Sequence, residues 1–116
     1  MADLVPAQNF AAHLLAALAK AGVRNFFLAP GARSQALAIA AGQLADAAKI
    51  NLHIRLDERS LGFNAIGAAL ASGEPSVLIT TSGTAVANLH PAVLEAHHSG
   101  VPLILLTADR PHELRG

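Results

Sequence analysis

Four short apolar runs, each followed by a turn rich in glycine, proline or polar residues, most constrain how this chain can fold. The runs cover residues 25–29, 51–56, 76–80 and 101–107, and alanine-rich stretches with helical apolar spacing separate them. Strands that alternate with helices at roughly 25 residues per unit are the signature of a parallel sheet with right-handed crossovers. The sequence therefore predicts an α/β fold, a three-layer open parallel sheet with helices on both faces, truncated at about four strands.

Apolar spacing places the helices. The first predicted helix runs from Gln8 to Lys20, ends before Gly22, and buries a face made of Phe10, Leu14, Leu15 and Leu18. A second reaches about Ala45, and a third spans Leu61 to Ser72. In the third, Gly62 and Gly67 permit a close approach of backbones. Pro91 interrupts a fourth helical stripe, so we expect a kink or a first-turn restart there.

Two of the strands carry more specific predictions. Residues 51–56 alternate, with Asn51, His53 and Arg55 on one face and Leu52, Ile54 and Leu56 on the other. This pattern predicts a half-exposed strand near an edge. Residues 101–107 form the most continuous apolar run, which predicts a central strand.

Composition narrows the possible functions. The 116 residues are 53% hydrophobic, have a formal net charge of zero, and contain no cysteine. The basic residues are scattered, which argues against nucleic acid or an anionic membrane as a partner. The absence of cysteine excludes thiolate metal sites and thiol catalysis. No apolar run approaches the ~18 residues of a membrane span and no signal peptide is visible, so we expect a cytoplasmic protein.

The chain ends at Gly116, just past a predicted strand. Doubly wound sheets normally carry about five or more strands. We therefore expect residues 1–116 to be the N-terminal part of a longer polypeptide.

Polar residues gather where the four predicted strands end. The turns cover residues 30–34, 57–60, 81–84 and 109–111. Parallel strands bring these turns to one edge of the sheet, where open α/β folds bind ligands. Most of the chain's polar chemistry near the core lies in them, which indicates one shared site: Arg33, Glu58, Arg59, Ser82, Thr84, Asp109 and Arg110.

The residues alone leave several roles open. Arg33 either receives a carboxylate or phosphate, or pairs with Asp57 or Asp109 across the rim. Arg110 either reaches the same anion or solvates a strand end. Glu58 either acts on a bound cofactor or is one of the acids that a helix N-terminus favours, and we expect Asp57 and Arg59 to hold that turn.

The turn Ser82-Gly83-Thr84 also has two readings. It either cradles a ligand or is only a tight turn between a strand and a helix. It lacks the lysine of a Walker loop. The six histidines lack a supporting ligand motif, so we predict no metal site in this chain.

Four segments in order resemble the N-terminal pyrimidine-binding domain of thiamine-diphosphate enzymes. They are Ala29–Ser34, Asp57–Gly62, Thr81–Leu89 and Thr107–Pro111. Within that superfamily the chain resembles the 2-succinyl-5-enolpyruvyl-6-hydroxy-3-cyclohexene-1-carboxylate synthases of menaquinone biosynthesis. The resemblance covers nearly all of this chain and a minor part of a full synthase.

The resemblance implies roles for the residues. Glu58 would be the catalytic glutamate that hydrogen-bonds N1' of the cofactor's aminopyrimidine and favours its imino tautomer. Ser82, Gly83 and Thr84 would pack near that ring. Arg33 and Arg110 would hold the carboxylates of the acceptor. Ala32 stands where the family more often has a serine that contacts the substrate.

The resemblance also implies a reaction and partners. The family decarboxylates 2-oxoglutarate and adds the resulting carbanion to isochorismate, with thiamine diphosphate and Mg²⁺ as cofactors. The Gly-Asp-Gly motif that binds the metal and the diphosphate does not occur here. It would lie in another domain, usually of the neighbouring subunit, so we expect a homo-oligomer whose site lies between subunits and a chain that is inactive alone. The alternatives are another thiamine-diphosphate 2-oxoacid decarboxylase or lyase, and a non-catalytic assembly module.

Overall fold

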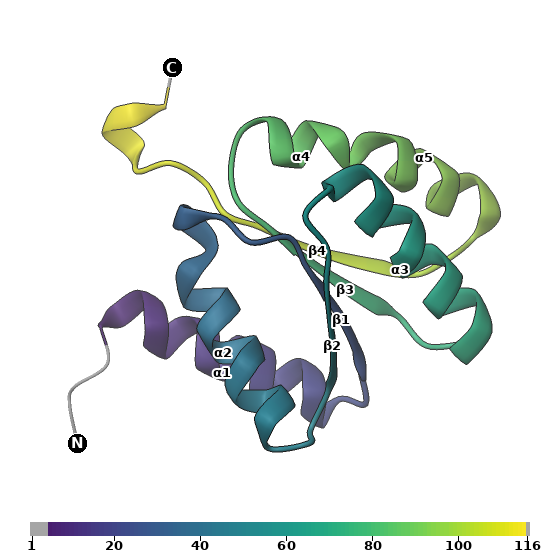
Figure 1. The fold of residues 1–116 in the computed structure, drawn as a ribbon, viewed down its shortest axis with the longest axis horizontal. Coiled ribbons are helices and arrows are strands. Elements are labelled where there is room, and N and C mark those ends of the chain that lie inside the picture. Colours follow the sequence, from purple (N-terminus) through teal and green to yellow (C-terminus); the bar gives the residue numbers. More distant parts are fainter. Residues whose placement is uncertain (1–4, 116) are drawn as a thin grey trace.

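Four parallel strands form one sheet in the order β2-β1-β3-β4 in the computed structural model, which describes residues 5–115. The strands are β1 (Asn25–Leu28), β2 (Asn51–Ile54), β3 (Ser76–Thr80) and β4 (Leu103–Thr107). Helices α1 (Pro6–Lys20) and α2 (Gln35–Asp46) cover one face, and α3 (Glu58–Ser72), α4 (Thr84–Asn88) and α5 (His90–Ser99) cover the other (Figure 1). The predicted three-layer parallel fold is confirmed.

The sheet topology places a switch point between the two inner strands. From β1 the chain passes through α2 to β2 on one side, and returns through α3 to β3 on the other. Leu28 of β1 pairs in register with Ile54 of β2 and Ile79 of β3, and Thr80 of β3 pairs with Thr107 of β4. The carboxyl ends of all four strands therefore lie at one edge, where such folds bind ligands.

Two apolar layers sandwich the sheet. On the side of α1 and α2, the core contains Leu15, Phe26 and Ile79. On the side of α3, it contains Phe27, Leu61 and Leu78. All five residues of β3 are buried, as expected for an inner strand of a parallel sheet.

The first helix ends as predicted and buries most of the predicted face, since Leu15 is buried and Leu14 and Leu18 are half-buried. Its last residue is Lys20, and Gly22 follows with a φ of 105°. The buried line is Ala11, Leu15 and Ala19, whereas Phe10 is 68% exposed. The prediction was wrong for Phe10, because its ring lies at the open hollow beside β4 and not in the core.

Two predictions for the later helices are confirmed. The chain restarts at Pro91, because α4 ends at Asn88 and α5 begins at His90 with the proline in its first turn. Gly62 permits a close approach, since a Cβ there would lie 2.6 Å from the Cβ of Ala92 in α5. For Gly67 the same prediction was wrong, because a Cβ there would meet no atom within 4 Å.

The strand predictions were partly wrong. The second strand does lie at an edge, but Ile54 and Leu56 are 52% and 87% exposed instead of buried. His53 stacks on the buried Phe27 with ring centroids 4.6 Å apart. A residue of the predicted polar face therefore packs against the core. β4 lies at the other edge of the sheet formed by residues 5–115, not at its centre. A continuous apolar run indicates two covered faces and does not fix the strand order.

None of the helices within residues 5–115 combines the length and the apolar character needed to cross a bilayer.

Candidate active site

The predicted site residues lie on one rim of the sheet, in the order of its strands. Glu58 follows β2, Arg33 follows β1, Ser82 follows β3 and Arg110 follows β4. Neighbouring strands lie about 4.8 Å apart, so the turns of Glu58 and Arg110 are roughly 14 Å apart along the rim. Arg33 and Ser82 lie between them, on the two strands of the switch point.

Asp57 and Glu58 are adjacent in sequence but differ in their partners. Asp57 caps α3, because its carboxylate accepts a hydrogen bond from the Ser60 backbone N–H at 2.8 Å. The Ser60 hydroxyl, the Ser60 backbone N–H and, to a smaller extent, the charge of Arg59 lower the pKa of Asp57. The prediction for this turn is confirmed for Asp57, whereas the Arg59 side chain forms no hydrogen bond or ion pair among residues 5–115.

Glu58 is the first residue of α3 and is half-buried. It takes part in none of the side-chain hydrogen bonds or ion pairs found within residues 5–115. Because Asp57 is committed to the cap, Glu58 is the carboxylate of this turn that is available to a ligand.

The turn that carries Arg33 is fixed by a buried serine and a close loop contact. Arg33 lies in the short 3-10 helix η1 (Ala32–Ser34), where the Ser34 hydroxyl donates to the Gly31 carbonyl at 3.1 Å. A Cβ at Gly31 would overlap the side chain of Thr81, so only glycine allows these two turns to touch. The β1 and β3 turns are therefore packed against each other at the switch point.

Arg33 itself is exposed and has no ion pair with any residue in the described part of the chain. The alternative of a pair with Asp57 or Asp109 is excluded for this structure, because Asp57 binds Ser60 and Asp109 binds Arg115. The guanidinium of Arg33 is left free to bind an anion.

The turn Ser82-Gly83-Thr84 links β3 to α4 and has an unusual backbone. Gly83 has a φ of 76°, a conformation that favours glycine. A Cβ at Gly83 would meet no atom within 4 Å, and Ser82 is half-buried beside it. The turn therefore presents open space to a ligand at the rim.

Beyond β4, Asp109 organises the turn that carries Arg110. Its carboxylate accepts a hydrogen bond from the Arg110 backbone N–H at 2.7 Å and lies 3.0 Å from Nε of Arg115. Arg115 also donates to the Arg110 carbonyl at 3.1 Å, across the 3-10 helix η2 (His112–Leu114). The Arg110 side chain is exposed, with no ion pair to the described residues.

A cavity of about 470 Å³ adjoins the rim between α1, α2 and β4. Its lining is mainly apolar and includes Phe10, Leu14 and Leu105, with Arg33 and Asp109 among its polar members. Arg33 and Asp109 are therefore the predicted site residues that border this open hollow, which is large enough for a small molecule.

Sequence reasoning missed the residues that fix the turns. Ser34, Thr81 and Arg115 each hold a site turn in place. Ser34 and Thr81 lie in segments that carry the resemblance but were given no role, and Arg115 lies outside those segments. For Ser34 the signal was its place between a strand-end turn and a helix, where serine commonly bonds nearby backbone. No group of three or more histidine, aspartate or glutamate side chains within residues 5–115 is arranged to hold a metal ion.

The arrangement on the rim is suited to binding an anionic ligand beside a carboxylate that can share a proton. Arg33 and Arg110 supply fixed positive charge, and Glu58 supplies the carboxylate. The Ser82-Gly83-Thr84 turn offers open space at Gly83 on the same rim.

Comparison with known proteins agrees with this fold. Residues 8–116 match the family described as thiamine pyrophosphate enzyme, N-terminal TPP binding domain. Curated relatives are named 2-succinyl-5-enolpyruvyl-6-hydroxy-3-cyclohexene-1-carboxylate synthase. The relative from Leifsonia xyli subsp. xyli is 61% identical over 111 residues, which are 96% of this chain and 19% of the relative.

Two further relatives carry the same name. The protein from Kineococcus radiotolerans is 59% identical over 96% of this chain and 20% of its own length. The protein from Clavibacter michiganensis subsp. michiganensis is 57% identical over 96% of this chain and 19% of its own length. The chain thus spans about a fifth of the length of the curated relatives it matches.

Proposed function

This chain belongs to the family of N-terminal TPP-binding domains of thiamine pyrophosphate enzymes, and we propose that it supplies the pyrimidine-binding half of the active site of a 2-succinyl-5-enolpyruvyl-6-hydroxy-3-cyclohexene-1-carboxylate synthase. The names of relatives that are 57–61% identical support the synthase. The reaction would decarboxylate 2-oxoglutarate and add the product to isochorismate in menaquinone biosynthesis. Thiamine diphosphate, when bound, supplies the carbanion chemistry for both steps.

One observation carries the proposal: Glu58 stands half-buried on the ligand-binding rim without a partner among residues 5–115, while its neighbour Asp57 is used as a helix cap. The Glu58 carboxyl would hydrogen-bond N1' of the aminopyrimidine and share a proton with it, which a carboxyl in partly dry surroundings can do. Ser82, Gly83 and Thr84 would lie against the ring, where the open space at Gly83 leaves room for a planar group.

Arg33 and Arg110 would bind the carboxylates of isochorismate. Both guanidinium groups are exposed and without an ion pair in residues 5–115, so a carboxylate does not have to displace an internal partner. A planar guanidinium also matches a carboxylate with two parallel hydrogen bonds, which would orient the acceptor as well as attract it.

Mg²⁺ and the cofactor's diphosphate would be held by residues outside this chain. The described residues offer no group of three metal-binding side chains, and of the two carboxylates that share a rim turn, Asp57 is used as the cap of α3. The cofactor would therefore lie between this domain and another, usually from a neighbouring subunit. Because half of the site would come from another subunit, we expect a homo-oligomer, and we expect residues 1–116 to be inactive alone. We also expect the enzyme to be cytoplasmic.

The test is Glu58→Gln in the full-length enzyme that carries this chain. Glutamine keeps the size of the side chain but cannot share a proton with N1', so product formation from 2-oxoglutarate and isochorismate should fall by about 100-fold or more. Asp57→Asn is the matched control, because asparagine still caps a helix, and it should stay near the activity of the unmodified enzyme. Equal activity of the Glu58→Gln and Asp57→Asn enzymes would remove Glu58 from the mechanism.

The acceptor is tested separately with Arg33→Ala and Arg110→Ala. Each should raise KM for isochorismate by about tenfold and leave KM for 2-oxoglutarate nearly unchanged, since each removes one charged hydrogen-bonding partner of the acceptor. Unchanged saturation by isochorismate would favour another 2-oxoacid decarboxylase or lyase. A full-length enzyme without thiamine-diphosphate-dependent turnover would favour the assembly module.

A further inference from the structure

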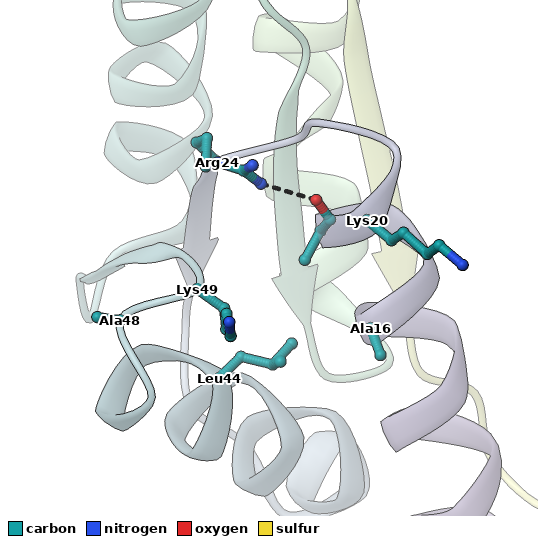
Figure 2. Close-up of a pocket in the computed structure, with 7 residues that line it drawn as sticks. Ala16, Lys20, Arg24, Leu44, Ala48 and Lys49 are labelled. Atoms are coloured by element: carbon teal, nitrogen blue, oxygen red, sulfur yellow. Dashed lines mark hydrogen bonds between the residues drawn. The ribbon is translucent and has the colours of Figure 1, made fainter.

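A second cavity lies at the amino edge of the sheet, opposite the rim that carries Glu58. It is an open hollow between the C-terminal ends of α1 and α2, has a volume of about 580 Å³, and is lined mostly by exposed residues (Figure 2). Arg24 precedes β1 and Lys49 precedes β2, and the two segments are joined by a hydrogen bond from the Asn51 N–H to the Arg24 carbonyl at 2.7 Å. The volume is in the range of about 300–1,000 Å³ that small-molecule sites occupy.

The lining of this cavity is basic and apolar. Lys20 and Lys49 are the two lysines of the chain, and both line it together with Arg24. The other lining residues are apolar, and none is a carboxylate: Ala16, Ala19, Leu44 and Ala48. None of the three cations forms an ion pair within residues 5–115. The cavity thus concentrates positive charge that the described part of the chain does not neutralise.

Capping of the helices does not account for the two lysines. At the end of α2, the carbonyls of Gln43, Ala45 and Leu44 already accept the backbone N–H groups of residues 47, 48 and 49. At the end of α1, the carbonyls of Ala17, Leu18 and Ala19 accept those of residues 21, 23 and 22. Three of the last four carbonyls of each helix are therefore already satisfied without a lysine.

Arg24 is held in position by one of its guanidinium nitrogens, which leaves its other donors free. Its Nη1 donates to the Ala19 carbonyl at 2.7 Å and approaches the Val23 carbonyl at 3.4 Å. A guanidinium has five N–H donors, so most of them are available to a ligand. Figure 2 shows Arg24 above the space and Lys49 below it beside Leu44, whereas Lys20 runs outward and away from both.

The turn before Lys49 is strained. Ala48 is the one non-glycine residue with positive φ found in residues 5–115, at 54°. Alanine rarely adopts this left-handed conformation, and such residues cluster at binding sites. Here the conformation ends α2 and sends the chain through Lys49 along the wall of the cavity.

We propose that this cavity binds a small anionic molecule, with a phosphate or carboxylate group between Arg24 and Lys49 and an apolar body against Leu44 and Ala16. The three cations gather at one hollow while the other basic residues of the chain are scattered, which favours a small molecule, because nucleic acid is bound by an extended basic surface. The opposite position of Glu58 on the sheet makes this a site separate from the rim residues.

The test uses the 116-residue chain and measures backbone amide shifts by NMR during titration. Phenyl phosphate and benzoate distinguish the two possible headgroups, inorganic phosphate lacks the apolar body, and benzyl alcohol lacks the charge. We expect saturable shifts around residues 44–49 with phenyl phosphate, benzoate or both. The better of these two should bind at least about fivefold more tightly than inorganic phosphate and benzyl alcohol.

Variants compare the two lysines of the hollow. Lys49→Gln should weaken binding by about fivefold or more, and Lys20→Gln by about twofold, because Lys20 points away from the space. Arg55→Gln is the matched control for loss of one positive charge, since Arg55 lies after β2 at the other edge and its Nη1 donates to the Ile54 carbonyl at 2.8 Å. It should leave the affinity unchanged.

Three outcomes would overturn the proposal. One is the absence of saturable shifts around residues 44–49 with either aromatic anion. Another is an equal loss of affinity in Lys49→Gln and Arg55→Gln, which would indicate only a general charge effect. The last is tighter binding of a single-stranded oligonucleotide to the same residues than of either anion, which would make this face a nucleic-acid surface.

Discussion

Two buried hydroxyl groups on β3 differ in whether they have a hydrogen-bond partner. The Ser76 hydroxyl donates to the Ala65 carbonyl in α3 at 2.9 Å. Thr80, which is fully buried, has no partner for its Oγ1 among residues 5–115. An unsatisfied buried polar group costs about 1–3 kcal/mol, whereas a satisfied hydrogen bond contributes about 1 kcal/mol. The same strand therefore contains one stabilising and one destabilising hydroxyl.

Substitutions at these two positions should change stability in opposite directions. Thr80→Val keeps the shape and removes the unsatisfied group, so the free energy of unfolding should rise by about 1 kcal/mol. Ser76→Ala removes the hydroxyl that donates to the Ala65 carbonyl and should lower the free energy of unfolding by about 1 kcal/mol. Urea unfolding of both variants measures the difference. A loss of stability in both would show that the Thr80 hydroxyl is satisfied in solution.

Asp57 makes the stability of the chain depend on pH. Hydrogen bonds from Ser60 lower its pKa in the folded protein, so the unfolded chain binds a proton more readily than the folded one. The stabilisation is complete above the unfolded pKa of about 3.9 and is lost as the pH falls through the lower folded pKa. Asp57 should therefore contribute fully at neutral pH and nothing in strong acid.

Asp57→Asn tests this contribution because asparagine keeps the cap and cannot titrate. The free energies of unfolding of the original and the variant, measured from pH 7 to pH 2, should differ by a constant amount above about pH 5. Below about pH 4 the original should lose stability relative to the variant. A difference that stays constant over the whole range would exclude Asp57 as the source.

At the scale of elements, two glycines of α3 provide a matched pair. Gly62 is buried where α3 touches α5, and Gly67 is exposed on the same helix. Gly67→Ala should raise the free energy of unfolding by about 0.5–1 kcal/mol, because alanine is the better helix former. Gly62→Ala gains the same propensity but forces a Cβ against Ala92, so it should lower stability by about 1–2 kcal/mol. Thermal unfolding of both variants distinguishes the effect of packing from that of helix propensity. If both substitutions raised the free energy of unfolding, the close contact at Gly62 would be contradicted.

The elements themselves were largely predictable, and their packing partners were not. Glycine and proline mark chain reversals through fixed backbone preferences, so the restart at Pro91 and the end of α1 followed from sequence. The positions of Phe10 and β4 depend on which neighbours cover them. Phe10 lies at the open hollow beside β4, and β4 lies at an edge, and neither fact is written in a local apolar pattern.

At the scale of the whole molecule, the shared rim was predictable because parallel strands must end at the same edge. Which of the charged side chains on the rim pair with each other was not predictable. Asp109 was an equal candidate for Arg33, yet it binds Arg115, which reaches it only because η2 folds the chain back. Such pairs depend on three-dimensional turn geometry, for which the sequence had no marker.

Few charges stabilise the molecule, and an apolar edge is open. The described residues contain one ion pair, Asp109–Arg115, and both side chains are more than half exposed. The outer edge of β4 has no partner strand within residues 5–115, and the cavity beside it is lined by Phe10, Leu14 and Leu105. Unpaired strand edges and contiguous apolar surface promote association between chains.

The 116-residue chain should therefore self-associate at concentrations well above micromolar. Phe10→Asp places a charge beside the cavity and should shift the chain toward monomer at little cost to folding, because Phe10 is 68% exposed. Leu114→Asp is the matched control, since Leu114 is also exposed but lies on η2 and does not line that cavity, and it should leave the association unchanged. Sedimentation velocity measures both. A single monomeric species of the unmodified chain would show that the open edge of β4 is protected in solution, and equal dissociation by both variants would move the contact away from the cavity at Phe10.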